Sequence, residues 1–415
     1  MKTLAINGGP KAVTSPLPVR GHFGAEEKAA ANRIMDEAIA KGVAPGYGGP
    51  EEDALCKEFS EMLGGGYADG VNSGSTAVFV ALRALDLEPF SEVILGPITD
   101  PGGMMPIVMA NMIPVVADAE PGTYNIGIDG IKAAYTERTR AIIVAHIAGE
   151  PADMEAICAF AKEKNLKIVE DCAQAHGASI GGKPVGTFGD VAAFSMMYGK
   201  HTCTGGQGGL VFTTNEEIYW RVRQNSDRGK PFGLEPGSTN CVGSLNFNLD
   251  EMASAIGRVQ IQKQFPIAKA RRDVIAKLWA KLSDLPCLKA SPLAPNAEPS
   301  YWFYRMLFDA STVTCTKLDF AKAIMAEGIG DVIAYYGATP YLSDWATNKK
   351  VFGTSQYPWA APEYKGDHNM TYSLLPNIAK SQEDTLAIFP IETWTDETIE
   401  QVSNAFHKVY EVYKK

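Results

Sequence analysis

Apolar positions in the first 260 residues follow two spacings that alternate along the chain. Apolar residues three or four positions apart are typical of helices, and short continuous apolar runs between turn residues are typical of buried strands. The predicted helices cover 25–41, 76–85, 128–135, 154–163 and a segment that follows Pro50 and ends at glycines 64–66. The predicted strands cover 93–95, 114–117, 141–146, 166–170, 191–195 and 209–213. This order predicts a large α/β domain with a mainly parallel sheet flanked by helices.

The pattern changes after a long helical stretch at 249–281. A loop rich in proline and alanine (292–299) precedes an aromatic strand at 301–308, a helix at 318–327 and a C-terminal helix at 396–413. These elements predict a smaller α+β domain. We therefore expect a large domain over residues 1–265, which includes the N-terminal segment, and a small domain over residues 266–415.

The 415 residues are 46% hydrophobic, which is enough for two domains with their own cores. Acidic residues outnumber basic ones by 48 to 38, and no basic run interrupts the net charge of -10, so nucleic acid and anionic membranes are not expected partners. No window holds the roughly 18 apolar residues of a membrane span, and the first apolar stretch is too short for a signal peptide. The seven cysteines form no C-x-x-C pair, which favours reduced thiols over disulfides or a zinc site. We expect a cytoplasmic protein without a metal.

Two of the predicted strands end in side chains that suit one cofactor. One strand runs into Asp171, and the next delivers the hydroxyl of Ser195 and then the amine of Lys200. Pyridoxal 5'-phosphate (PLP) requires a carboxylate that keeps its ring nitrogen protonated and a lysine that forms a Schiff base. The glycine-rich loop after Lys200 has little bulk and no charge, which would desolvate the amine and lower its pKa. Asp171 alone could equally be a structural cap or a metal ligand, but the pair indicates a PLP enzyme.

The turn before the helix at 76–85 reads Asn-Ser-Gly-Ser-Thr and covers residues 72–76. Its backbone N–H groups and hydroxyls, at Gly74, Ser75 and Thr76, lie at the positive end of the helix dipole, which suits a phosphate group. An ordinary helix N-cap has the same composition, so this segment alone leaves both interpretations open. The chain has no G-x-x-x-x-G-K-[ST] pattern, and a nucleoside triphosphate site is not supported.

Several motifs in a fixed order resemble the DegT/StrS family of sugar aminotransferases, which are PLP enzymes of fold type I. The resemblance covers nearly the whole chain. The matching stretches are residues 72–76, Ile-Pro-Val-Val-Ala-Asp at 113–118, Val-Glu-Asp-Cys-Ala-Gln-Ala-His-Gly-Ala at 169–178, Gly-Thr-Phe-Gly-Asp at 186–190, Phe-Ser at 194–195 through Lys200, and Leu-Asn-Phe-Asn-Leu-Asp-Glu-Met-Ala at 245–253. The opening Leu-Ala-Ile-Asn-Gly-Gly-Pro at 4–10 resembles members that act on cyclitols and related ketones.

The resemblance implies roles for the residues around the cofactor ring. Lys200 would form the Schiff base, Asp171 would pair with the pyridine nitrogen, and Gln174 would lie near the phenolic oxygen.

The resemblance also implies how the phosphate is held. Gly74 and Ser75, in the same turn as Thr76, would bind it together with Ser195. Asn246 would reach the phosphate of the cofactor in a neighbouring protomer, which requires a homodimer with composite active sites.

Four features depart from the family pattern or from its usual chemistry. Asp100 stands where the family has an aromatic residue that stacks on the cofactor, and Asn248 replaces an arginine. The loop at 204–209 is one residue longer than the family's and lacks its acid. His201 follows the lysine directly, and some members use a histidine in place of the lysine to run a dehydration. Asp100 and His201 are therefore candidate substrate residues.

The resemblance implies a PLP-dependent aminotransferase that moves an amino group from glutamate or glutamine to a keto group of a nucleotide sugar or cyclitol. The cofactor would cycle through pyridoxamine 5'-phosphate (PMP). Because Lys200 is present, transamination is favoured over a PLP- or PMP-dependent sugar dehydratase. A second alternative is a non-catalytic protein of the same fold that senses a sugar nucleotide, which Asp100 and the altered glycine loop would suit. The acceptor, the amino donor and the pathway are not fixed by the sequence.

Overall fold

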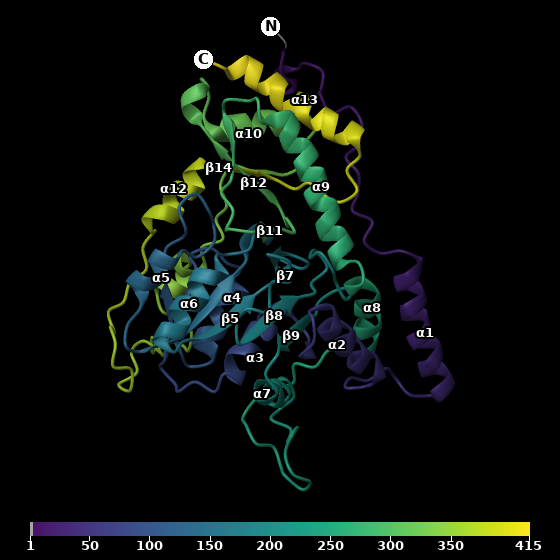
Figure 1. Ribbon diagram of the computed structural model, residues 1–415, viewed down its shortest axis with the longest axis vertical. Helices are drawn as coiled ribbons and strands as arrows, with labels where there is room; N and C mark the ends of the chain where they lie inside the picture. Colours follow the sequence, from purple (N-terminus) through teal and green to yellow (C-terminus); the bar gives the residue numbers. More distant parts are fainter. Residues whose placement is uncertain (1–2) are drawn as a thin grey trace.

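The larger part of the molecule is built on a seven-stranded sheet with the strand order β1-β9-β8-β5-β4-β2-β3. The computed structural model describes residues 3–415, and Figure 1 shows this sheet in the lower half of the view. The pairs from β8 to β3 are parallel, and in this sheet β9 alone runs against its neighbours. The strands are β1 Tyr67–Val71, β2 Glu92–Leu95, β3 Ile113–Val116, β4 Thr139–Ala145, β5 Lys167–Asp171, β8 Val191–Ser195 and β9 Gly209–Thr213. The predicted α/β fold with a mainly parallel sheet is confirmed.

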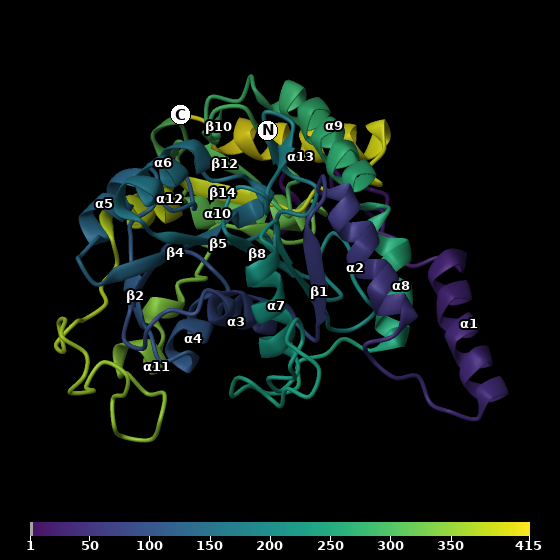
Figure 2. The same cartoon turned by 60° about the horizontal axis from the view of Figure 1, so that its bottom comes forward.

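Helices cover both faces of this sheet, because successive strand residues point to opposite sides. Ile143 of β4 lies in the core formed with α3, α4 and α7, whereas Ile142 and Val144 lie in the core formed with α6. Figure 2 shows α3 and α4 on one side of β4 and β5, with α6 on the other. The helices are α2 Pro50–Met62, α3 Gly74–Ala84, α4 Pro101–Met109, α5 Ile128–Ala134, α6 Met154–Lys164, α7 Glu216–Ser226 and α8 Glu251–Ile261. Both faces of the strands are therefore apolar.

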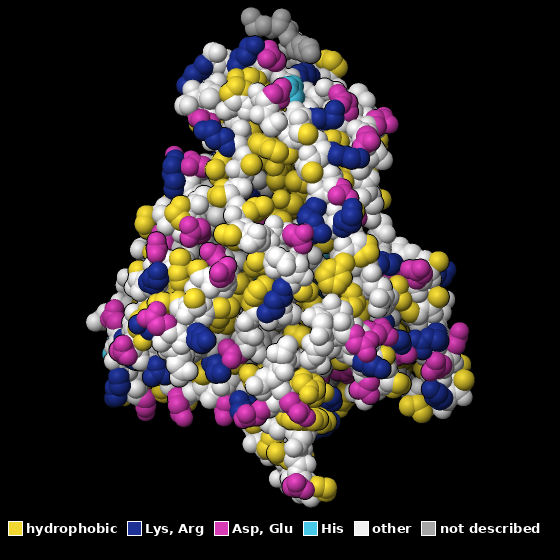
Figure 3. All heavy atoms as spheres, in the orientation of Figure 1, with side chains coloured by type: hydrophobic (Ala, Val, Ile, Leu, Met, Phe, Trp, Pro, Cys, Tyr) yellow, Lys and Arg dark blue, Asp and Glu magenta, His cyan; other side chains and the backbone are white. Residues whose placement is uncertain are grey.

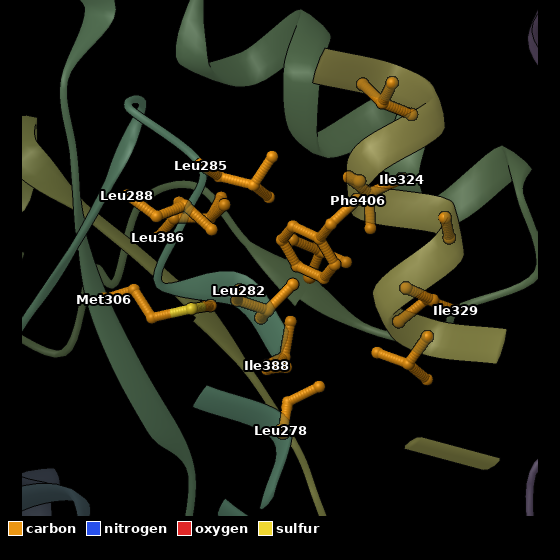
Figure 4. Close-up of a cluster of buried hydrophobic side chains, with 14 of the residues drawn as sticks. Leu278, Leu282, Leu285, Leu288, Met306, Ile324, Ile329, Leu386, Ile388 and Phe406 are labelled. Atoms are coloured by element: carbon orange, nitrogen blue, oxygen red, sulfur yellow. The ribbon is translucent and has the colours of Figure 1, made fainter. Parts of the chain in front are cut away.

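The smaller part has a four-stranded antiparallel sheet in the order β10-β12-β14-β13. Its strands are β10 Leu288–Ala290, β12 Tyr304–Phe308, β13 Val332–Ile333 and β14 Thr385–Ile388, and its main helices are α9 Gln264–Leu282, α10 Lys317–Ala326 and α13 Asp396–Tyr413. Figure 4 shows Leu282, Ile324, Ile388 and Phe406 meeting in the core between these elements. A small sheet of β6 Ser179–Ile180, β7 Lys183–Pro184 and β11 Ala297–Glu298 connects the two parts.

Two segments pack differently from the predicted division at residue 265. Leu4 and Val13 lie in the core of the small domain, where the Glu327 carboxylate accepts hydrogen bonds from the backbone of Ala5 (2.8 Å) and Ala12 (2.9 Å). The chain then crosses to α1 Ala25–Lys41, which packs on α8 at the edge of the large domain (Figure 1). The exact division remains a prediction.

A segment that follows β13 returns to the large domain. It includes α11 Asp344–Thr347 and precedes α12 Pro376–Asp384. Its buried residues Trp359 and Tyr364 pack against Val108 and Ile113, near the end of α4 and the start of β3. The C-terminal 150 residues therefore do not form one separate body. Among residues 3–415 no helix combines the length and the apolar character needed to cross a membrane.

Candidate functional site

Asp171 lies at the carboxyl end of β5, where the paired strand β8 leads on to Ser195 and Lys200. The carboxylate is buried, and its Oδ1 accepts a hydrogen bond from the backbone N–H of Ala173 at 3.0 Å. Burial raises the pKa of Asp171, and the positive charge of Lys200 opposes this rise. Among residues 3–415 no donor engages Oδ2, so this oxygen can accept a hydrogen bond from a ligand.

Lys200 follows β8 in a turn that its own N–H closes on the carbonyl of Met197 at 2.9 Å. The side chain is buried, and its Nζ lies 4.1 Å from the centroid of the Trp302 ring. Burial lowers the pKa of Lys200, while Asp171 raises it. An amine with a lowered pKa is more often unprotonated near neutral pH and so more nucleophilic. The ring of Trp302 stabilises the cation that remains.

The start of α3 approaches the end of β8 closely enough to form a phosphate cradle. A Cβ placed on Gly74 would lie 2.5 Å from the Cβ of Ser195, so this approach requires glycine. The N–H groups of Gly74 and Ser75 belong to the first turn of the helix and have no acceptor within it. Together with the hydroxyl of Ser195, these N–H groups are donors that an anion at the positive end of the helix could accept from.

Thr76, in contrast, is used inside the helix cap. Its backbone N–H donates to Ser73 Oγ at 3.2 Å, and its hydroxyl donates to Asn72 Oδ1 at 2.8 Å. The N-cap interpretation of this turn is therefore confirmed, and phosphate binding by the turn remains a prediction. Thr76 serves the N-cap, and its two neighbours present the donors.

Gln174 lies beside the site on the loop that follows β5. Its Oε1 accepts a hydrogen bond from the backbone of Ala148 at 2.8 Å, and its side chain also contacts the phenol of Tyr336. The Tyr336 ring stacks on Tyr124 with 5.6 Å between centroids and lies 5.0 Å from Phe303. Neither Tyr336 nor Trp302 was predicted as a site residue from the sequence, because both come from the small domain and carry no local signal.

Asp100 is exposed and serves as the N-cap of α4, where its Oδ1 accepts from the N–H of Gly102 at 2.9 Å. Its negative charge lies close enough to raise the pKa of Asp171 slightly. A Cβ on Gly103 would collide with Thr99 Oγ1 and would lie 3.3 Å from Asp171 Oδ2. The backbone of the first turn of α4 thus comes close to Asp171, next to the position where the family places an aromatic side chain.

The remaining candidate residues lie away from this cluster. The His201 side chain is fully buried, with its Nε2 3.1 Å from the carbonyl of Ser300, a placement that argues against substrate contact. Asn246 is exposed, and its Oδ1 accepts from the backbone N–H of Asn248 at 3.1 Å. The adjacent Phe247 carbonyl accepts from the N–H of Asn72 at 2.8 Å, which places Asn246 on the surface near the phosphate turn.

Three side chains next to the site are close enough to bind a metal ion, but they are engaged in hydrogen bonds within the protein. His146, Glu170 and Cys172 have potential ligand atoms within 4.8 Å of one another. The carboxylate of Glu170, however, accepts from the backbone of Gly186, Phe188 and Gly189 at 2.7 Å each. His146 Nε2 lies 3.2 Å from the same carboxylate, so this group is structural.

The residues of the site fit PLP. A buried carboxylate with a free oxygen, a buried amine and a cradle of N–H and hydroxyl groups match the pyridine nitrogen, the aldehyde and the phosphate of this cofactor. Because Lys200 can hold and release a proton, the site can bind an amine and move a proton at the carbon to which the amine is attached.

Comparison with known proteins also indicates a PLP-dependent aminotransferase. Residues 26–369 match the DegT/DnrJ/EryC1/StrS aminotransferase family. A UDP-N-acetyl-3-dehydro-alpha-D-glucosamine 3-aminotransferase of Acidithiobacillus ferrooxidans is 34% identical over 288 residues, which are 69% of this chain and 75% of the relative. A putative L-glutamine:3-amino-2,3-dideoxy-scyllo-inosose aminotransferase of Micromonospora echinospora is 31% identical over 333 residues, 79% of this chain and 78% of the relative. The crystal structure of an aminotransferase from Psychrobacter cryohalolentis superposes with a TM-score of 0.81 at 26% identity, covering 96% of this chain and 99% of that one.

Proposed function

The chain belongs to the DegT/DnrJ/EryC1/StrS aminotransferase family, whose members depend on PLP, and from this premise we propose that it transfers an amino group from glutamate or glutamine to a keto group of a nucleotide sugar or cyclitol. The observation that carries the proposal is the buried pair of Lys200 and Asp171 at neighbouring strand ends. The two relatives named above support the class of acceptor and, for one of them, glutamine as the donor.

Each residue of the site has a place in this reaction. When bound, PLP supplies a carbonyl that condenses with amines and a ring that withdraws electrons. Asp171 would keep a proton on the ring nitrogen, because its free Oδ2 is a buried anion that a positive N–H stabilises. Lys200 would take the proton from the donor's α-carbon and return it on the cofactor side of the donor's nitrogen, so that the amino group stays with the cofactor. Ser195 and the start of α3 would hold the phosphate still.

Lys200 also favours transamination over dehydration. Some family members that dehydrate sugars use a histidine in place of this lysine, and in this chain the histidine that follows it in sequence, His201, is turned into the core. An intact amine beside an intact carboxylate likewise opposes a purely sensory role.

We further propose that the enzyme is a homodimer whose sites are completed by the partner. Large apolar side chains are exposed around the site, with 71% exposure for Tyr198 and 68% for Leu245, and Ile39 on α1 is 75% exposed. Exposed apolar groups near a functional site are typical of protein interfaces. Asn246 lies next to Leu245 on this surface. Acidic and basic side chains are interspersed on the face seen in Figure 3.

The function is tested by following each half-reaction separately. Protein loaded with PLP is mixed with glutamate, glutamine or alanine without an acceptor, and the cofactor absorbance and the 2-oxo acid product are measured. The proposal predicts conversion to PMP by glutamate or glutamine, followed by recovery of PLP when a keto nucleotide sugar or a keto cyclitol is added. Absorbance that stays unchanged with every amino donor would support the sensor instead.

A further inference from the structure

The N-terminal segment that precedes α1 passes directly behind the lysine of the site. The guanidinium of Arg20 donates hydrogen bonds to the carbonyl of Lys200 and to the carbonyl of His201, the latter at 2.7 Å. His22 reaches the same Lys200 carbonyl, with 3.0 Å from its Nε2 to the oxygen. Burial lowers the pKa of His22 to about 4, so the ring is neutral at ordinary pH and Nε2–H donates. Two side chains more than 170 positions away in sequence thus hold one peptide group.

Arg20 is in turn fixed by the small domain. Its Nε donates to Glu392 at 2.9 Å, and the other oxygen of Glu392 accepts from Arg271 at 2.8 Å. Arg271 also donates to the carbonyl of Tyr301 at 2.8 Å. A carboxylate between two arginines in a mostly buried position has strong, directional partners on both sides.

The same network reaches the amine side of the lysine. Trp302, the residue after Tyr301, donates its indole N–H to the carbonyl of Gly199 at 3.2 Å and places its ring 4.1 Å from Lys200 Nζ. The turn that carries Lys200 is therefore held before the lysine by Trp302 and after it by Arg20. Lys200 lies outside the helices and strands, so no regular backbone ladder fixes it.

We infer that Arg20 is a positioning residue for Lys200, which fixes the lysine backbone to the small domain through Glu392 and so sets where the amine stands in the site. This inference rests on the proposed function for its kinetic consequence only. A reactive group that is displaced by about 1 Å can lose on the order of 100-fold in rate, while the binding of a substrate that Arg20 does not touch is unaffected.

The test compares Arg20→Met and Arg20→Lys with a matched control, Arg272→Met. Arg272 neighbours Arg271 on α9 and also donates to a backbone carbonyl, that of Pro299 at 3.1 Å, but it has no bond to the lysine turn. We expect Arg20→Met to slow the donor half-reaction by about tenfold or more with little change in the donor KM. Arg20→Lys keeps a positive charge for Glu392 but lacks the several N–H donors of the guanidinium. Its rate in the donor half-reaction should therefore lie between those of Arg20→Met and wild type. The control should behave like wild type.

A second measurement does not depend on turnover. Cofactor-free protein is acetylated with acetic anhydride over a range of pH, and the Lys200 peptide is quantified by mass spectrometry. Wild type should show a labelling midpoint below that of exposed lysines, and Arg20→Met should move it upward, because a loosened turn lets the amine reach water. If Arg20→Met does not fold, Arg20→Lys carries the same comparison. A folded variant with an unchanged labelling midpoint and an unchanged rate of the donor half-reaction would overturn the inference. A wild type that is inactive, together with a labelling midpoint that shifts in the variant, would overturn the proposed function alone.

Discussion

At the scale of single residues, burying the two charged side chains of the site lowers the stability of the folded protein when no ligand is bound. Asp171 and Lys200 are both buried, and burial disfavours the charged form of each. The pair attracts, but one carboxylate oxygen retains no protein donor among residues 3–415. A bound positive ring nitrogen would complete the set, so the cost of burying these groups is consistent with a site made for a ligand.

The first prediction concerns Asp171→Asn. The amide keeps the shape of the side chain but no longer stabilises a proton on the ring nitrogen, so we expect turnover to fall by on the order of 100-fold or more. Circular dichroism should show an unchanged fold. A variant with bound cofactor that turns over at nearly the wild-type rate would remove this role from Asp171.

The second prediction separates the charge of Asp100 from its role as a helix cap. Asp100→Asn keeps an acceptor for the N–H of Gly102, so unfolding free energy should change by less than about 0.5 kcal/mol. Asp100→Phe removes the cap and should cost about 1 kcal/mol. Both variants should retain PLP and slow the acceptor half-reaction more than the donor half-reaction. Full acceptor rate in Asp100→Asn would show that the charge has no part in catalysis.

Single residues differ in how far the sequence could identify them. Asp171 and Lys200 were predictable because Asp171 ends one recognisable strand, Lys200 lies in the turn that follows another, and the ends of neighbouring strands meet. Trp302 and Tyr336 were not, since their contacts with Lys200 and Gln174 depend on how the small domain folds back. His201 shows the opposite error, because its place beside the lysine in sequence says nothing of its side-chain direction.

At the scale of elements, helix α4 shapes the site most directly. Its first turn carries two glycines, and a Cβ on Gly103 would meet both Thr99 and Asp171. The helix begins at Pro101 and contains Pro106, so neither its composition nor its glycines suggested a helix. Strands β8 and β9 and helix α13, whose apolar patterns are strong, were predicted at the residues where they occur.

The third prediction is that Gly103→Ala disturbs the site and that Gly206→Ala does not. The added methyl at residue 103 must displace Thr99 or the carboxylate of Asp171, whereas residue 206 faces open space. We expect weaker PLP binding in Gly103→Ala, by about tenfold, measured by fluorescence titration of cofactor-free protein. Gly206→Ala should bind PLP as wild type does. Equal affinities for all three proteins would mean that α4 does not border the cofactor.

At the scale of the whole molecule, the large and the small domain contact each other at the turn that carries Lys200. Arg20 of the N-terminal segment and Trp302 of the small domain both donate hydrogen bonds to the lysine turn, and Arg271 of α9 is linked to Arg20 through Glu392. Periodicity in the sequence could suggest two domains, but it could not show that Leu4 would enter the core of the small one. Such long-range packing depends on the surface that the other elements present.

The fourth prediction tests the composite active site. Lys200→Ala and Asn246→Ala should each be inactive or nearly so as homodimers. Mixed under conditions that exchange subunits, they should recover up to about one quarter of the wild-type activity per total protein, because half of the dimers are mixed and each has one intact site.

Two observations would contradict the composite site. One is an active protein that light scattering shows to be strictly monomeric. The other is a mixture that exchanges subunits, as shown by mass spectrometry of differently tagged chains, but regains no activity although both single variants fold.

The role of Lys200 as the residue that binds PLP is tested most directly by trapping the cofactor on the protein. Protein loaded with PLP is reduced with borohydride and digested, and the modified peptide is identified by mass spectrometry before and after incubation with glutamate or glutamine. We expect a phosphopyridoxyl group on Lys200 that disappears from the protein when an amino donor is added before reduction, because the cofactor has then left the lysine as PMP. A group attached to a different lysine, or one on Lys200 that persists with every donor, would contradict it.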